Sequence, residues 1–180
     1  MNRFVVALLG TVLSAAAMAA DFVAQVQGRE GLVLTLPAGW SAHLDQSQPG
    51  LPPTVKITSA DRTAFQVLIT PIPTTGGRSN SPTEIRKLVE RGLDNIKASA
   101  VESSISIQEL AASDKAGYYF SATDRQPEPE GYKYLTQGAL AFGDLKVTFT
   151  VLTNRQQGEV ARQVIDMLRS AKRSPRGNAA

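Results

Sequence analysis

Three side chains that hydrolases combine lie close together in one short segment: Ser41, His43 and Asp45. A serine nucleophile needs a histidine base about 3 Å away and a carboxylate that orients the histidine. Alternate residues of a strand share a face but lie roughly 6.5 Å apart. The segment also lacks the second glycine of a nucleophile elbow. It is therefore predicted to be a polar strand-to-loop segment without catalytic residues.

The chain offers few other ligands for a metal or a cofactor. It has no cysteine and a single histidine, which excludes thiolate sites and histidine clusters. Asp124, Glu128 and Glu130 are close in sequence, but prolines separate them and their spacing is not that of a calcium-binding loop. Residues 76–79 are rich in glycine but lack a phosphate-binding pattern, so a flexible loop is favoured. We therefore expect no cofactor and no metal.

Four aromatic residues are candidates for binding: Trp40, Tyr119, Tyr132 and Tyr134. Tryptophan is favoured at binding hot spots, although a lone tryptophan after a proline–glycine bend more often fills the end of a core. Tyr132 and Tyr134 share one face near the end of a predicted strand. These four side chains are the predicted interaction surface, with a place in the core as the alternative for Trp40.

Apolar and polar residues alternate through much of the chain, which is typical of half-buried strands. Ser81, Pro82 and Glu84 form a capping box that opens a helix, with Glu84 expected to reach back to the Ser81 amide. Gly92 lies on the apolar stripe of this helix and is expected to let a strand approach closely. The predicted strands are 31–36, 55–58, 65–69, 105–107, 118–121, 132–142 and 145–152, and the predicted helices are 82–96 and a segment from about 156.

The order of these elements predicts an α+β fold. Short links between consecutive strands point to a mostly antiparallel sheet, which two amphipathic helices must partly cover. Residues 21–171 are expected to form one domain. Residues 172–180 have no apolar periodicity and include Pro175, so a disordered basic tail is predicted. Deleting residues 174–180 is expected to change the stability by less than about 0.5 kcal/mol.

The first twenty residues have the three-part layout of a secretory signal peptide. Arg3 supplies a positive charge, an apolar run follows, and Ala17 and Ala19 precede a cleavage site. The mature chain is expected to begin at Ala20 or Asp21, in the periplasm or outside the cell, without stable insertion in the membrane. An uncleaved membrane anchor is the alternative. The chain is not expected to be a lipoprotein, because lipid attachment at this junction needs a cysteine.

The charge of the predicted domain is close to zero, although the whole chain is basic. The chain holds 19 Lys and Arg against 16 Asp and Glu. Arg3 lies in the predicted signal peptide, and Lys172, Arg173 and Arg176 lie in the predicted tail, so residues 21–171 hold 15 basic and 16 acidic side chains. A nearly neutral domain lacks the electrostatic footprint of a nucleic-acid binder. A nucleic-acid partner is therefore not expected.

Several of these features together resemble a known family. They are a strand ending in Leu-Pro-Ala-Gly-Trp at 36–40, a central helix, a Gly-Tyr-Tyr-Phe strand at 117–120, a long hairpin and a C-terminal helix. This pattern is similar to the PsbP-like α/β/α sandwich, and most similar to its DcrB-type bacterial periplasmic members. Members of that fold share binding to protein, so the resemblance implies an interaction role by analogy of fold.

The sequence thus predicts an exported, non-enzymatic protein that binds another protein or a component of the cell envelope. The first alternative is a small-molecule or lipid binder with a pocket between the sheet and a helix. A hydrolase that uses Ser41 is the second alternative.

Overall fold

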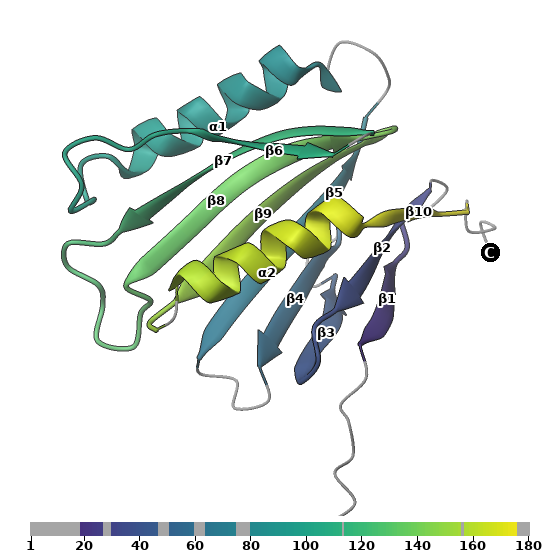
Figure 1. Cartoon of the computed structure of the whole chain (residues 1–180), viewed down its shortest axis with the longest axis horizontal. Helices are drawn as coiled ribbons and strands as arrows, with labels where there is room; N and C mark the ends of the chain where they lie inside the picture. The colour runs from purple at the N-terminus through teal and green to yellow at the C-terminus, as the bar shows by residue number, and fades with distance from the viewer. Residues whose placement is uncertain are drawn as a thin grey trace, which may run out of the picture.

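The computed structural model describes residues 19–26, 30–46, 51–59, 64–74, 80–112, 114–155 and 157–175. Residues 1–18 of the predicted signal peptide lie outside these ranges, and so do the glycine-rich residues 76–79. The described elements follow the order drawn in Figure 1. They are β1 (Ala20–Ala24), β2 (Gly31–Leu36), β3 (Trp40–Asp45), β4 (Thr54–Ser59), β5 (Phe65–Pro73), α1 (Pro82–Ile96), β6 (Gln108–Ala112), β7 (Lys115–Thr123), β8 (Tyr134–Phe142), β9 (Leu145–Thr153), α2 (Gln157–Ser170) and β10 (Lys172–Ser174).

Most of the strands form one antiparallel sheet. Its seven strands follow the order β3-β4-β5-β9-β8-β7-β6, and each neighbouring pair is antiparallel. A smaller sheet has the order β1-β2-β10, also antiparallel. The hairpin between β8 and β9 turns at Gly143, whose φ of +57° suits a residue without a side chain. The predicted α+β class with a mostly antiparallel sheet is therefore confirmed.

One face of the seven-stranded sheet is buried, and we call it the covered face. Val147, Phe149 and Val151 of β9 lie on it, and none of them has more than 2% of its surface exposed. Val164 and Leu168 of α2 belong to the same core, together with the leucines of β2. Figure 1 shows α2 crossing in front of these strands. The larger core therefore lies between the sheet, α2 and the small sheet.

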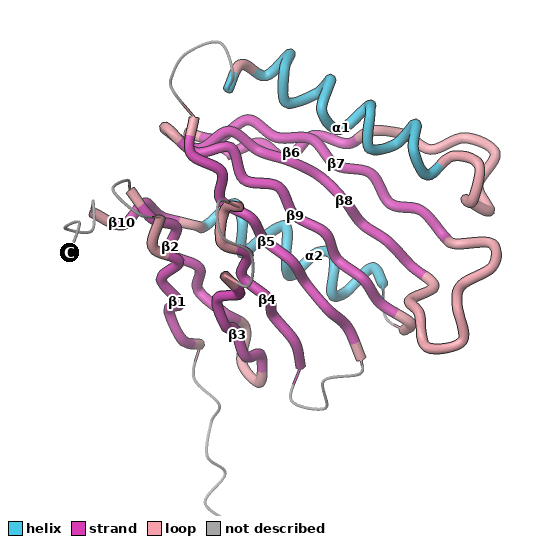
Figure 2. Tube along the Cα trace, turned by 180° about the vertical axis from the view of Figure 1, so that it is seen from behind, coloured by secondary structure: helices cyan, strands magenta, loops and turns pink. Residues whose placement is uncertain are grey.

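The helix α1 lies on the opposite face of the sheet, over β7 and β8. Ile85, Val89 and Leu93 of α1 are buried against Phe120 of β7 and Ala139 of β8. Seen from behind in Figure 2, β3, β4, β5 and β9 have no helix in front of them, and α2 lies beyond them. The two helices therefore lie on opposite faces, and α1 covers only part of its own face.

The predicted cap of α1 is half present. The Ser81 side chain accepts a hydrogen bond from the Glu84 amide at 3.3 Å, as an N-cap should. The Glu84 carboxylate binds Lys87 Nζ at 3.0 Å and does not complete the box. The prediction for the reciprocal bond was wrong because an ion pair one turn away takes this carboxylate.

The predicted strand at 105–107 was also wrong. Ile105 and Ile107 lie in a loop and pack against the α1 core, and the strand β6 begins at Gln108. Their alternation reflects partial burial of two side chains against this core, without pairing to a neighbouring strand. The segment with Ser41, His43 and Asp45 was predicted to pass from strand to loop, and it is strand throughout, as β3.

The predicted tail begins with an ordered strand. Lys172, Arg173 and Ser174 form β10 and pair with β2. Ser174 Oγ accepts a buried hydrogen bond from the Gly31 amide at 3.0 Å. A Cβ on Gly31 would lie 2.5 Å from this oxygen, so the glycine makes room for the serine. The prediction of disorder was wrong for these three residues because backbone pairing replaces the missing apolar pattern.

Candidate functional site

The half of the sheet face that α1 leaves uncovered is the candidate functional site, and we call it the open face. Its side chains come from β3, β4, β5 and β9 and alternate with residues of the covered face. They are Ser41, His43, Asp45, Thr54, Lys56, Thr58, Gln66, Leu68, Thr70, Ile72, Lys146, Thr148, Thr150 and Leu152.

The open face is polar, although most of its side chains are half-buried. Thr54 and Thr70 share a hydrogen bond of 2.8 Å between their hydroxyl groups on β4 and β5. Ser41 and Thr58 share a longer one of 3.4 Å on β3 and β4. Hydroxyl pairs of this kind join neighbouring strands and leave lone pairs directed away from the sheet. The face therefore offers donors and acceptors in ordered rows.

Positive charge predominates on the open face. Lys56 of β4 and Lys146 of β9 make no ion pair in the described part of the chain, whereas Lys87 of α1 pairs with Glu84. Asp45, at the edge strand β3, is the acidic side chain on this face. Unpaired cations on a half-buried surface favour a partner with negative charge.

A polar hollow of about 350 Å³ lies at the β3 side of the open face. Its walls include Ser41, His43, Lys56, Gln66 and Tyr132. Tyr132 belongs to the long connection between β7 and β8, which brings it to strands far away in sequence. No hydrogen bond joins Ser41 to His43 among the described residues. The two side chains share a face, but they lack the contact that a nucleophile and its base require.

A second cavity, of about 330 Å³, lies where α1 meets the open face. Arg91, Gly92 and Asn95 form its helix side, and Phe120 and Gln137 belong to its floor. The Cβ of an alanine at position 92 would lie 3.5 Å from Gln137 Oε1 and 3.7 Å from Phe120, both ordinary contact distances. No strand backbone approaches Gly92 closely, so that prediction was wrong. The glycine instead borders an open space.

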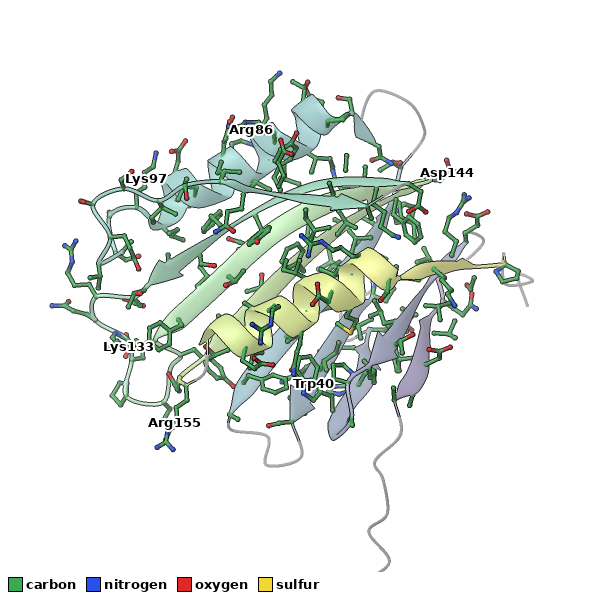
Figure 3. All side chains as sticks on the ribbon, in the orientation of Figure 1. Trp40, Arg86, Lys97, Lys133, Asp144 and Arg155 are labelled. Atoms are coloured by element: carbon green, nitrogen blue, oxygen red, sulfur yellow. The ribbon has the colours of Figure 1, made fainter. Side chains whose placement is uncertain are left out.

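The four predicted aromatic residues do not form one surface. Trp40 lies on the covered face of β3 and packs against Phe65, with ring centres 4.5 Å apart (Figure 3). Tyr119, near the opposite edge of the sheet, donates its hydroxyl to Gln108 at 2.8 Å. Tyr134 pairs with Thr153 on the covered face. Only Tyr132 of the four lines the hollow on the open face.

No local sequence pattern indicates the buried lysine on β7. Lys115 Nζ, on a side chain that is 4% exposed, donates to the Arg169 carbonyl at 2.9 Å and to Asp114 at 3.0 Å. It also lies 4.4 Å from the centre of the Phe142 ring. The hydrogen bond from Lys115 holds the pKa of Asp114 below its ordinary value. A cation at this place complements the exposed carbonyls at the C-terminus of α2. We therefore assign Lys115 a role in stabilising the fold.

The loop after α1 is fastened to β7 by a carboxylate. Burial raises the pKa of Glu102, but hydrogen bonds from the Thr123 hydroxyl and amide outweigh this effect and hold the pKa below its ordinary value. The hydroxyl bond measures 2.6 Å and the amide bond 2.9 Å. The Glu102 carboxylate and the Thr123 side chain therefore hold the loop against β7.

Acidic residues do not gather at a metal site in the described ranges, where no group of three or more His, Cys, Asp or Glu is placed to hold an ion. The Asp124 carboxylate accepts a bond from the Gln126 amide at 3.0 Å. Across the same ranges, no helix is long and apolar enough to cross a bilayer.

Comparison with known proteins bears on the fold alone. No family model matches the chain, and no curated protein matches its sequence. Among solved structures, the chain is similar to the solution structure of cyanobacterial PsbP (CyanoP) from Synechocystis sp. PCC 6803. The likeness has a TM-score of 0.55 at 10% identity and covers 91% of this chain and 98% of that chain. The chain therefore has a PsbP-like fold.

Proposed function

We propose that this protein is exported and binds another protein through the open face, without catalysing a reaction. The observation that carries the proposal is the uncovered half of the sheet, which presents paired hydroxyl groups together with the cations Lys56 and Lys146. A partner with an acidic surface fits this charge. An acidic component of the cell envelope is the alternative partner.

Export is supported by the N-terminal segment. Its charged, apolar and small-residue parts have the layout of a signal peptide. The strand β1 begins at Ala20, so cleavage before Ala20 or Asp21 keeps the strand nearly whole. We infer a periplasmic or secreted location and a folded domain that runs from Ala20 to Ser174. Within the PsbP-like proteins, we infer that the chain is most similar to the DcrB-type members.

The absence of catalysis is part of the proposal. Ser41 and His43 are exposed and separate on β3, and Ser41 shares its hydrogen bond with Thr58. An interaction role also agrees with the PsbP-like fold, by analogy. A serine-directed fluorophosphonate probe should therefore leave wild-type protein and Ser41→Ala equally unlabelled.

Affinity capture with matched variants tests the interaction. Purified protein is immobilised, and captured proteins from an envelope extract are compared between Lys56→Gln/Lys146→Gln and Lys97→Gln/Arg155→Gln. Each variant loses two charges, and Lys97 and Arg155 project outward at the ends of α1 and β9 (Figure 3). We expect one reproducible partner that the first variant loses and the second retains. Equal capture by both variants would contradict a role for the open face.

A further inference from the structure

The cavity between α1 and the sheet supports a second kind of binding, independent of the proposed protein interaction. Its volume of about 330 Å³ equals the space of roughly eleven water molecules. This volume lies at the lower end of the range for small-molecule sites. The cavity therefore suits a compact ligand.

The polar side chains around this cavity have no partner within the described ranges. Arg91 and Asn95 lie one helical turn apart on α1, Gln137 comes from β8, and Thr148 from β9. None of the four makes a side-chain hydrogen bond or an ion pair there. Gln137 and Thr148 are half-buried. Half-buried amides and hydroxyls without protein partners are available to a ligand.

Arg91 differs from its neighbours on the same helix. Arg86 binds Glu90 at 3.0 Å, and Lys87 binds Glu84 at 3.0 Å. Arg91 has no such carboxylate in the described ranges and lines the cavity. Its guanidinium group suits a carboxylate, which it can bind through two parallel hydrogen bonds.

Gly92 keeps space open beside Arg91. A glycine inside a helix is less favourable than alanine. The nearest atoms, on Gln137 and Phe120, would be at ordinary contact distance from an alanine Cβ, so packing does not require glycine at this position. A longer side chain would enter the cavity. The residue thus costs helix stability and leaves room that the fold itself does not use.

The apolar lining of the cavity indicates the chemistry of the rest of the ligand. Val89, Phe120 and Ala139 are buried beneath it, and Leu88 is a half-buried apolar residue of its lining. Arg91 and Asn95 are exposed at the rim. We propose that this cavity binds a small organic acid, with its carboxylate on Arg91 and its apolar body against Leu88. The volume fits an acid of roughly ten non-hydrogen atoms.

Calorimetric titration with octanoate tests the proposal, and octan-1-ol serves as a comparator of similar length without charge. We expect octanoate to bind with one-to-one stoichiometry and octan-1-ol to bind about tenfold more weakly or worse. Amide shifts of Gln137 and Thr148 should change with octanoate in a nuclear magnetic resonance titration. No binding of octanoate, or equal binding of the alcohol, would overturn the proposal.

Variants locate the binding. Arg91→Gln should weaken octanoate binding about tenfold, and Lys87→Gln, which removes a charge on the same helix outside the cavity, should leave it unchanged. Gly92→Leu should abolish binding while the circular dichroism spectrum stays that of the folded protein. If Gly92→Leu does not fold, the amide shifts in wild-type protein decide the matter. Equal losses in Arg91→Gln and Lys87→Gln would contradict the site.

Discussion

The two faces of the seven-stranded sheet are built from the same strands and differ in almost every physical property. On β9, Phe149 is 1% exposed and packs in the main core, whereas its neighbours Thr148 and Thr150 are half-buried on the open face. The covered face is sealed by α2 and the small sheet, and α1 covers only β7 and β8 of the other. The covered face and the part beneath α1 therefore hold the fold together, and the open face is available for binding.

The largest expected effect comes from a pair of substitutions on β9. Phe149→Ala removes a buried ring and should lower the free energy of unfolding by about 3–5 kcal/mol. Thr150→Ala, on the next residue and the opposite face, should cost less than about 1 kcal/mol. Urea unfolding of both variants measures the difference. Equal losses would show that the open face is part of the core.

The next largest effect tests whether β10, in the small sheet, contributes to stability. Ser174→Ala removes the partner of the buried Gly31 amide and should cost about 1–3 kcal/mol. Ser41→Ala, on the exposed part of β3, should change the stability by less than about 0.5 kcal/mol. Thermal unfolding of the two variants provides the comparison. A neutral Ser174→Ala would restore the expectation of a tail without structural role.

A substitution at the edge of the open face should stabilise the protein. Gly92→Ala adds a methyl group that meets Gln137 Oε1 at 3.5 Å, an ordinary contact. The gain in helix propensity is up to about 1 kcal/mol. An increase in the urea midpoint is expected, and a decrease would mean that α1 and the sheet already fit tightly at this point.

The smallest effect concerns pH, because the group involved is exposed. The folded-state pKa of Asp114 lies below its ordinary value of 3.8, so its carboxylate contributes stability above this pH. That contribution is lost as the pH falls through the folded-state pKa. Wild-type protein should be more stable than Asp114→Asn near pH 6, and the two should converge near pH 2. A difference that persists in acid would exclude the ion pair with Lys115 as its cause.

Local patterns explain which elements were predictable. The alternation in β5, β8 and β9 and the Ser81 cap are properties of a few consecutive residues, and the structure has elements at those places. The strands β1 and β10 depend on pairing with β2, and the Gly31–Ser174 bond spans 143 positions. Apart from Gly31, the first residue of β2, no local sequence pattern indicates this contact.

The candidate site was harder to predict than the fold. The sequence identified Tyr132 and the polar segment at Ser41 and His43, but treated them separately, and only tertiary packing brings them to one hollow. Trp40 and Tyr119 were candidates by residue type, yet their places on the covered face follow from strand register. Gly92, on an apolar helical stripe, was the one local signal for the second cavity.

Site-specific photo-crosslinking tests the central claim, binding through the open face, most directly. A benzophenone side chain is placed at Gln66 on β5, within the open face, or at Gln163 on α2, on the other side of the sheet. Both glutamines are half-buried, so the two positions are matched in residue type and in exposure. Illumination in the exporting cell should give a discrete adduct from Gln66 and none from Gln163. Adducts from Gln163 alone, or the same adducts from both positions, would contradict the account.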